Sequence, residues 1–421
     1  MRILFLNPAS VLGGAERSLL DLMASLRRAE PSIELHLAGP VEGPLAGEAE
    51  RLGVRVTSLP MTRVLTGLGD SGLRGRGRWR AALALLRSAM PAAWAGWGYV
   101  RRLRRLIESL RPDVVHSNGM KFHLLAALAT PRDRPPAVVW HLRDFLGNRR
   151  LMSRLLGRAA RRVAGAVAIS HAVAEDAQRV LPHLPIAVVH NAIDGEAFTA
   201  GPGDGARLDD LAALPPAPDG VVRVGLVAAF ARWKGQDVFL DAASRLMSTS
   251  PERPVRFYVV GGPLYETRGS QWSLDELRTR GAGLLAGGVL GFVGFRQDPA
   301  PVYRALDVVV HASTQPEPFG RTIIEAMSCG RAVIVARAGG AAELFTPDDD
   351  AVGVPPGDAD ALARAVADLV NDPAKRERLG DRARRSAVER FGRERLGPQV
   401  LDAYRRFATP HTTHTSERKL S

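Results

Sequence analysis

Residues 308–330, VVVHASTQPEPFGRTIIEAMSCG, join an apolar β-branched run to a helical pattern through a polar loop. The run 308–312 is typical of a buried strand of a parallel sheet. Phe319 and Gly320 stand where the helix begins, and backbone N–H groups at such a position attract anions. A strand, a loop and a helix in this order form one unit of an α/β fold, whose ligands lie beyond the carboxyl ends of the strands.

The same order of strand and helix repeats on both sides of this stretch. Short apolar runs predict further strands at 2–6, 33–38, 54–58, 113–116, 137–141, 165–169, 186–190, 222–228, 255–260, 288–292 and 332–336. Helical periodicity predicts helices at 15–28, 236–247, 362–371, 375–390 and 397–407. Because 421 residues exceed the usual size of one core, we expect an α/β fold of two doubly wound, Rossmann-like domains facing a cleft.

The boundary between the two domains is marked by a stretch rich in Gly, Pro and Asp at 199–219, which predicts a linker. We therefore expect an N-terminal domain at 1–198 and a C-terminal domain at 220–395. The helix at 396–408 is expected to pack back on the N-terminal domain, and residues 409–421 are expected to form a flexible tail.

Composition narrows the class of protein and its compartment. Hydrophobic residues make up 46% of the chain, which excludes a wholly disordered protein. Cys329 is the only cysteine, so an intramolecular disulfide and a cysteine-based zinc site are excluded. The first apolar run ends at Asn7 and is too short for a signal peptide, and the most apolar later stretch, 81–100, is expected to lie on a surface and not to cross a bilayer. These features predict a cytoplasmic protein.

The net charge of +13 is concentrated in the first half of the chain. Residues 1–200 carry 28 basic and 16 acidic side chains, and ten arginines but only one acid lie within 71–111, here called the basic segment. The basic segment also holds three of the six tryptophans. Arginine with tryptophan on an amphipathic helix is typical of contact with an anionic membrane. A solvated helical face beside a buried stripe of Leu83, Leu86, Met90 and Leu103 is the alternative.

Two loops predict a site for a phosphorylated ligand with hydroxyl groups. The chain has four lysines, and one of them, Lys234, lies directly after the predicted strand 222–228, where a compact ammonium would suit a phosphate. Glu317 and Glu325 stand eight positions apart, and carboxylates accept hydrogen bonds from sugar diols. A third loop, Gly13-Gly14, follows the first strand but lacks the spacing of a dinucleotide-binding motif.

Other polar residues lie at strand ends, at a helix start and in acidic clusters. His141 ends a predicted strand, where it could bond a ligand hydroxyl or simply the backbone. Ser170 is expected to cap the helix after it. The acidic clusters Asp209-Asp210 and 348–350 are expected to be solvated turns, so we predict no metal site.

These motifs together resemble the family-4 retaining glycosyltransferases of the GT-B fold. The resemblance rests on Gly13-Gly14-Ala15-Glu16, the Arg-Trp-Lys-Gly loop 232–235, and Glu317 followed eight residues later by Glu325. Asn191-Ala192-Ile193-Asp194 with Phe198, and 337–340 followed by Glu343, extend it over about residues 1–407.

The resemblance implies a role for each motif. The catalytic residues would be Lys234, Arg232, Glu317 and His141, with Glu317 on the donor sugar. Glu325 would contact the nucleoside ribose. The diphosphate would be held by Gly13, Gly14, Arg232, Lys234 and the backbone of Phe319 and Gly320. The base would lie near Gly262, Phe295 and Arg296. In the family an arginine commonly stands where this chain has Ala229, and we expect Arg232 to replace it.

The implied activity is transfer of a sugar from a nucleoside-diphosphate sugar to a glycan, polysaccharide precursor or glycolipid, with retention of configuration. The N-terminal domain would bind the acceptor and the C-terminal domain the donor. No cofactor and no metal are expected, because cations and N–H groups can stabilise the leaving diphosphate. Peripheral attachment to the inner membrane face through the basic segment is expected, and nucleic acid is not. A sugar-nucleotide epimerase of the same fold and a non-catalytic membrane- or nucleic-acid-binding protein are the alternatives.

Overall fold

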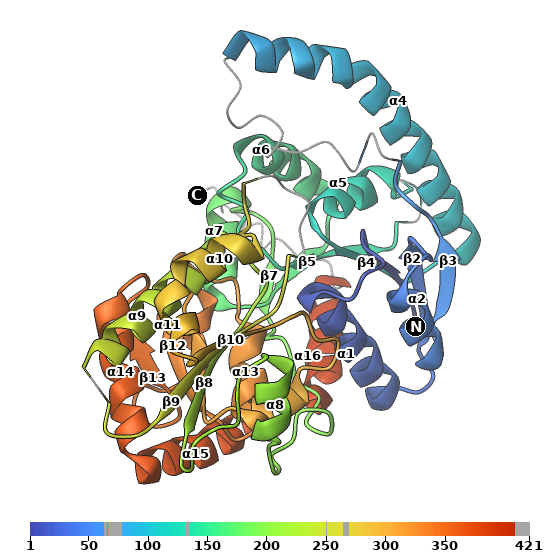
Figure 1. Cartoon of the computed structure of the whole chain (residues 1–421). Helices are drawn as coiled ribbons and strands as arrows, with labels where there is room; N and C mark the ends of the chain where they lie inside the picture. Colours follow the sequence, from blue (N-terminus) through green and yellow to red (C-terminus); the bar gives the residue numbers. More distant parts are fainter. Residues whose placement is uncertain are drawn as a thin grey trace, which may run out of the picture. The chain divides into compact units, whose positions relative to one another are not determined.

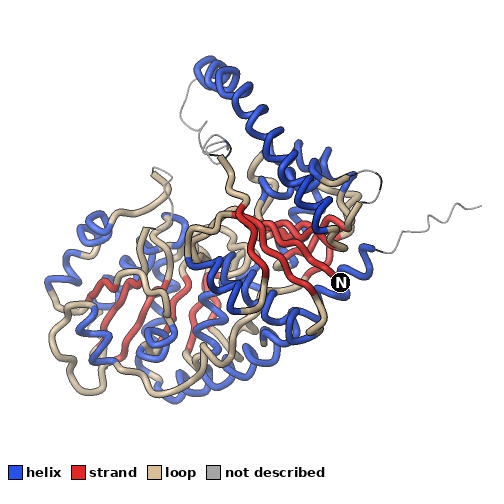
Figure 2. Tube along the Cα trace, turned by 90° about the vertical axis from the view of Figure 1, so that its right-hand side faces the viewer, coloured by secondary structure: helices blue, strands red, loops and turns tan. Residues whose placement is uncertain are grey.

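The computed structural model describes residues 1–62, 65, 78–131, 133, 135–249, 251–263 and 269–408, with the backbone alone over 78–92. These residues form two compact units. Unit 1 comprises Met1–Ala168, Ala174–Val189 and Leu396–Ser421, and unit 2 comprises Ile169–Val173 and His190–Arg395. The expected tail at 409–421 lies outside the described residues. Figure 2 shows the strands of each unit side by side with helices around them.

Unit 1 contains a seven-stranded sheet in the order β3-β2-β1-β4-β5-β6-β7, and every neighbouring pair is parallel. Its strands are β1 (Arg2–Leu6), β2 (Glu34–Gly39), β3 (Arg55–Ser58), β4 (Val114–Asn118), β5 (Ala137–Leu142), β6 (Gly165–Ala168) and β7 (Ile186–Val188). The strand order reverses beside β1, so ligands are expected beyond the carboxyl ends of β1 and β4.

The helices of unit 1 lie around this sheet (Figure 1). They are α1 (Gly14–Ala29), α2 (Pro44–Arg51), α4 (Arg78–Leu110), α5 (Met120–Ala129), α6 (Arg150–Ala159), most of α7 (His171–Val180) and α16 (Leu396–Ala408). Helix α16, the last one within the described residues, packs on α1, and the Gly397 N–H donates to Ser25 Oγ at 2.8 Å. A Cβ on Gly397 would lie 2.6 Å from the Ser25 carbonyl oxygen, so this close crossing requires glycine.

Unit 2 contains a six-stranded sheet in the order β10-β9-β8-β11-β12-β13, also parallel throughout. Its strands are β8 (Val222–Val227), β9 (Val255–Val260), β10 (Leu290–Val293), β11 (Val308–His311), β12 (Ala332–Ala336) and β13 (Val352–Val354). Its helices include α8 (Gly205–Leu211), α9 (Gln236–Ser248), α10 (Leu274–Arg280), α11 (Ala282–Ala286), α12 (Ala300–Ala305), α13 (Arg321–Ser328), α14 (Ala359–Asn371) and α15 (Pro373–Phe391). The α/β fold of two Rossmann-like domains is thus present, and β13 is a strand that the sequence did not predict.

The acidic clusters at 209–210 and 348–350 match the expected solvated turns only in part, because Asp210, Asp348 and Asp349 are exposed but Asp209 and Asp350 are buried. Asp209, on α8, is 3% exposed and pairs with Arg223 at 2.6 Å and Arg256 at 3.0 Å. It also accepts a hydrogen bond from the Tyr258 hydroxyl. Burial alone would raise the pKa of Asp209, but these donors outweigh it and hold the pKa below 3.8. For Asp209 the expectation was wrong, because arginines on β8 and β9 pair with this carboxylate and compensate its burial. Asp350 is also buried, and it accepts a hydrogen bond from the backbone N–H of Thr346 at 2.6 Å.

Candidate active site

Most of the predicted site residues stand at one edge of the sheet of unit 2. Lys234 lies in the short helix η3 (Arg232–Lys234) after β8, and Gly262 follows β9. Phe295 follows β10, and Glu317 lies in the loop between β11 and α13. Because the strands are parallel, all four loops leave the sheet at its carboxyl edge.

Lys234 and Glu317, predicted to share a site, are in direct contact. The Lys234 ammonium donates to both carboxylate oxygens of Glu317, at 2.7 and 2.8 Å. Ser313 Oγ donates to the same carboxylate at 2.8 Å, and the His311 ring lies 3.3 Å from it. Burial would raise the pKa of Glu317, but the Lys234 ammonium and His311 outweigh it, so the pKa lies well below its usual range. Glu317 is therefore an anion that holds the lysine in place.

A glycine brings these two loops together. Gly235 has φ +75°, and a Cβ there would lie 1.9 Å from the Ala312 carbonyl oxygen. The loop after β8 can therefore approach the end of β11 only with glycine at this position. This contact sets the Lys234 ammonium beside Glu317.

The loop before α13 is fixed by backbone hydrogen bonds. The Gly340 N–H donates to the Glu317 carbonyl at 2.7 Å. Gly320 precedes α13 with φ 101°, a left-handed conformation that lets the chain turn into the helix. The start of α13 is positively polarised, as in any helix. A cation and a helix N-terminus are thus carried by adjacent loops of unit 2.

Glu325 lies one turn inside α13 and is held by two neighbours. It accepts from the Tyr303 hydroxyl at 2.9 Å and from Arg321 at 3.2 Å. Burial and this carboxylate raise the pKa of Tyr303 well above its usual value. These partners explain how a buried carboxylate is accommodated on an apolar helix.

Arg232 does not join the Lys234–Glu317 pair. Its guanidinium pairs with Glu276 of α10 at 2.6 Å and lies 3.9 Å above the Trp272 ring. The replacement of the family's arginine at Ala229 by Arg232 therefore stays a prediction. Phe295 packs near Gly262 and its ring is largely exposed, so it is available to a flat ligand.

In unit 1, Gly13 and Gly14 stand at the start of α1, beyond the carboxyl end of β1. Gly13 is the N-cap, and its N–H donates to the Glu16 carboxylate at 3.2 Å. The Asn7 side chain bridges this turn to β4, because its Oδ1 accepts from Asn118 at 2.8 Å. The turn is therefore held by hydrogen bonds of the Glu16 and Asn7 side chains.

His141 is the penultimate residue of β5 and belongs to a buried chain of hydrogen bonds that the sequence did not reveal. Its Nδ1 lies 3.3 Å from Arg143 and 2.9 Å from Nε2 of His116, while the Tyr404 hydroxyl lies 2.6 Å from Nδ1 of His116. Arginine can only donate, so Nδ1 of His141 is an acceptor and its proton is on Nε2. Burial and the Arg143 charge hold the pKa of His141 well below 6.5, so the ring is neutral.

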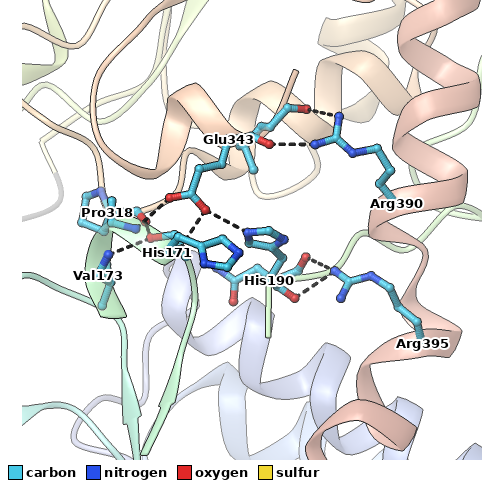
Figure 3. A network of polar contacts seen from close by, with 11 residues as sticks. His171, Val173, His190, Pro318, Glu343, Arg390 and Arg395 are labelled. Carbon is cyan, nitrogen blue, oxygen red and sulfur yellow. Dashed lines mark hydrogen bonds and ion pairs between the residues drawn. The ribbon is translucent and has the colours of Figure 1, made fainter. Parts of the chain in front are cut away.

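A further network ties the loop after β12 to the start of α7 (Figure 3). The Glu343 carboxylate accepts from the backbone N–H groups of His171 and Ala172, both at 2.8 Å, and lies 3.0 Å from Nε2 of His190. Within the described part of the chain, His171, His190 and Glu343 form a group that could hold a metal ion. Their potential ligand atoms lie within 4.8 Å of one another. Here, however, the carboxylate serves as a helix cap. Ser170 also caps α7, as expected, through the Val173 N–H.

Comparison with known proteins identifies the relatives of this chain. The family described as "Glycosyltransferase Family 4" matches residues 12–197, and the family described as "Glycosyl transferases group 1" matches residues 215–386. A protein named D-inositol 3-phosphate glycosyltransferase, from Rhodococcus jostii (strain RHA1), is 32% identical over 48% of this chain and 44% of its own length. The lipopolysaccharide core biosynthesis glycosyltransferase LpsE of Rhizobium meliloti (strain 1021) is 32% identical over 31% of this chain and 37% of its own.

These alignments are partial, and the chain spans about half the length, or less, of the curated relatives it matches. Among solved structures, Anabaena Alr3699/HepE in complex with UDP-glucose matches with a TM-score of 0.74 at 24% identity, over 96% of this chain and 99% of that chain. This likeness shows the shared fold. None of the helices within the described ranges combines the length and apolarity needed to cross a bilayer.

Proposed function

Because this chain belongs to the family-4 glycosyltransferases, we propose that it transfers a sugar from a nucleoside-diphosphate sugar to a hydroxyl group of an acceptor, with retention of configuration. The acceptor class is a glycan, a polysaccharide precursor or a glycolipid. The observation that carries the proposal is the bidentate pair between Lys234 and Glu317, at 2.7 and 2.8 Å.

This pair supplies the two charges that the reaction needs. Cleavage of the bond between the sugar C1 and the diphosphate oxygen leaves negative charge on the phosphate. In the proposed complex, the Lys234 ammonium turns to that phosphate, and the N-terminus of α13 adds its partial positive charge. The Glu317 carboxylate then accepts hydrogen bonds from sugar hydroxyls. A fixed cation and fixed dipoles can stabilise the leaving group without a metal ion.

Retention constrains where the acceptor enters. A new C1–O bond on the face that the diphosphate leaves places the acceptor hydroxyl beside the departing phosphate oxygen. That oxygen is then the nearest base, and it takes the acceptor proton as the new bond forms. His141 is neutral with its proton on Nε2, so we assign it a hydrogen bond to a substrate hydroxyl. Its low pKa makes it a weak base at neutral pH.

The nucleotide is proposed from a solved relative. The Anabaena protein is described in complex with UDP-glucose, so a uridine nucleotide is the first candidate. The R. jostii relative is named for D-inositol 3-phosphate, which makes a phosphorylated polyol one candidate acceptor beside glycans and lipids.

Thermal stabilisation by UDP-, GDP- and ADP-sugars tests the donor site. A ligand that binds the folded state raises the melting temperature. We expect one nucleotide series to do so in the wild-type protein and in the matched control Lys375→Met. The Lys234→Met variant should bind that series at least about tenfold more weakly, since it lacks a charge-assisted hydrogen bond. The proposal fails if no series raises the melting temperature of the wild-type protein.

We also propose that the protein is cytoplasmic and binds an anionic membrane surface through the described part of α4. Trp94 and Trp97 are 70% and 54% exposed, and Arg101 lies 4.5 Å above the Trp97 ring. With Arg105 they share one face of the helix, while Tyr99 packs inward. Side chains of 78–92 lie outside the described residues, so the proposal rests on the second half of the helix. Aromatic rings beside arginines are typical of an interfacial helix.

Co-sedimentation with vesicles of phosphatidylglycerol and phosphatidylcholine tests this surface. Binding should be strong at low salt and weaken as salt screens the charges. Trp94→Ala combined with Trp97→Ala should reduce binding, whereas the control Val388→Ala, at an exposed apolar position on α15, should not. The membrane proposal is wrong if the wild-type protein stays in the supernatant at low salt, or if the tryptophan variant binds as the wild type does.

A further inference from the structure

A buried chain of polar side chains runs through unit 1 from α16 to the end of β5. The Tyr404 hydroxyl lies 2.6 Å from Nδ1 of His116, and Nε2 of His116 lies 2.9 Å from Nδ1 of His141. The three side chains come from α16, β4 and β5, and each residue is at most 3% exposed. The chain thus connects the last helix within the described residues to the histidine that we assign to a substrate hydroxyl.

Arg143 determines the direction of every hydrogen bond in this chain. A guanidinium can only donate, so Nδ1 of His141, 3.3 Å from Arg143, carries no proton. Nε2 of His116 must then donate to it, which leaves Nδ1 of His116 to accept from the Tyr404 hydroxyl. With the opposite tautomer of His116, two ring nitrogens without protons would face each other at 2.9 Å. All the protons therefore point from Tyr404 towards His141.

This order of donors and acceptors does not change near neutral pH. Burial, together with the Arg143 charge, holds the pKa of His116 well below its ordinary value, as it does for His141. Burial also raises the pKa of the Tyr404 hydroxyl well above its ordinary value. Both imidazoles are therefore neutral, and the phenol keeps its proton.

The chain ends at the Nε2–H group of His141. In the described part of the structure no residue forms a hydrogen bond with this nitrogen, and it is not among the fully buried polar atoms that lack a partner. It stands near the carboxyl end of β5, the edge at which such sheets bind ligands. A donor at one ring nitrogen fixes the proton on the other, and linked hydrogen bonds strengthen one another.

We propose that His116 and Tyr404 are positioning residues for the transfer reaction. They fix the His141 ring and its proton so that the Nε2–H group is presented to a substrate hydroxyl. The proposal rests on the proposed function, in which His141 bonds that hydroxyl. It also gives α16, which packs on β5 as well as on α1, a role in the reaction.

Nitrogen-15 NMR of the histidine rings in the unliganded full chain tests the positioning, because protonated and bare ring nitrogens resonate far apart. We expect wild-type His141 to carry its proton on Nε2 at neutral pH. His116→Phe removes a donor to His141 and should shift the His141 resonances. Tyr404→Phe removes the donor to His116 but keeps the aromatic ring, and it should shift the His116 resonances. The control Tyr99→Phe removes another buried hydroxyl, which donates to the Leu59 carbonyl at 3.2 Å, and should shift neither.

Turnover measures the consequence for the reaction. The substrate is whichever of UDP-, GDP- and ADP-glucose raises the melting temperature of the wild-type protein most, with water as the acceptor, and release of the nucleoside diphosphate is followed. His116→Phe should lower kcat at least about tenfold, which corresponds to one hydrogen bond. Its thermal shift with the nucleoside diphosphate should match that of the wild type. His116→Gln should restore most of the activity, because its side-chain amide can supply an N–H group to His141. Tyr99→Phe should react as the wild type does.

Two results overturn the proposal. One is a wild-type His141 ring with its proton on Nδ1. The other is His116→Phe with unchanged His141 resonances, or with the turnover of Tyr99→Phe. If circular dichroism shows that His116→Phe is unfolded, unchanged His116 resonances in Tyr404→Phe overturn it instead. If no nucleotide sugar raises the melting temperature or releases its diphosphate in the wild type, the proposed function fails, while the NMR result still decides whether the positioning chain exists.

Discussion

Replacing Glu317 with glutamine should destabilise the protein more than loss of an ordinary ion pair. The Lys234 and Glu317 side chains are 18% and 9% exposed, so the pair is largely buried. Removing one partner of a buried pair costs about 3–5 kcal/mol, because the other charge stays buried and uncompensated. Lys234 retains some exposure and lies 4.2 Å from the Trp233 ring centroid, so we expect a cost near the lower limit, about 3 kcal/mol.

Replacing Lys234 with methionine should lower the free energy of unfolding by less than Glu317→Gln does. In Lys234→Met the Glu317 carboxylate keeps its contacts with Ser313 and His311, and we expect a loss of about 2 kcal/mol. The double variant removes both charges, so it should lose less than the sum of the single variants. A coupling free energy of at least about 1 kcal/mol is expected.

Urea unfolding followed by circular dichroism measures these free energies in the unliganded protein. The exposed pair Lys375–Asp368, at 2.6 Å, provides a matched control. Replacing Asp368 with asparagine should cost no more than about 1 kcal/mol. The reasoning is refuted if Glu317→Gln costs as little as the control, or if the effects of the two single variants simply add.

Four further predictions concern other parts of the structure. Gly235→Ala should cost more than about 2 kcal/mol, because its Cβ would lie 1.9 Å from the Ala312 carbonyl oxygen at φ +75°. The control Gly283→Ala has open space around the new Cβ and should cost almost nothing. Equal melting temperatures of the two variants would contradict this prediction. Asp209→Asn should lower the free energy of unfolding by about 3 kcal/mol, since its arginine partners are left without an anion; a loss below about 1 kcal/mol would show that solvent compensates it. The pKa of Glu317 is lowered by folding, so its contribution to stability is fully present above pH 4.5 and is lost as the pH falls below that value. The difference in unfolding free energy between the wild type and Lys234→Met should therefore become smaller below pH 4.5. A difference that stays constant down to pH 3 would contradict this prediction. Prolonged dialysis against EDTA should leave glycosyl transfer unchanged, whereas activity restored only by added Mn²⁺ or Mg²⁺ would contradict the proposed metal-free stabilisation.

The sequence predicted the fold and the grouping of Lys234 with Glu317 because both depend on local patterns. Apolar runs between turn residues mark the parallel strands, and loops after such strands meet at one sheet edge. The direct contact of the two side chains was not predictable, because it depends on how closely Gly235 approaches β11.

Long-range partners account for what the sequence could not reveal. Asp209 was expected to be solvated, and its burial depends on Arg223, Arg256 and Tyr258, which lie 14 to 49 residues away along the chain. Nothing local to an Asp-Asp pair signals such partners.

The packing of α16 on α1 also has a consequence for the order in which the protein is made. Unit 1 uses Met1–Ala168, Ala174–Val189 and the helix that begins at Leu396. On the ribosome its sheet is therefore synthesised well before α16, and His190–Arg395 of unit 2 emerges in between. Until then, the face of α1 that receives α16 has no cover, and the Tyr404 hydroxyl cannot yet bond His116. The first domain to begin folding is thus the last to be completed.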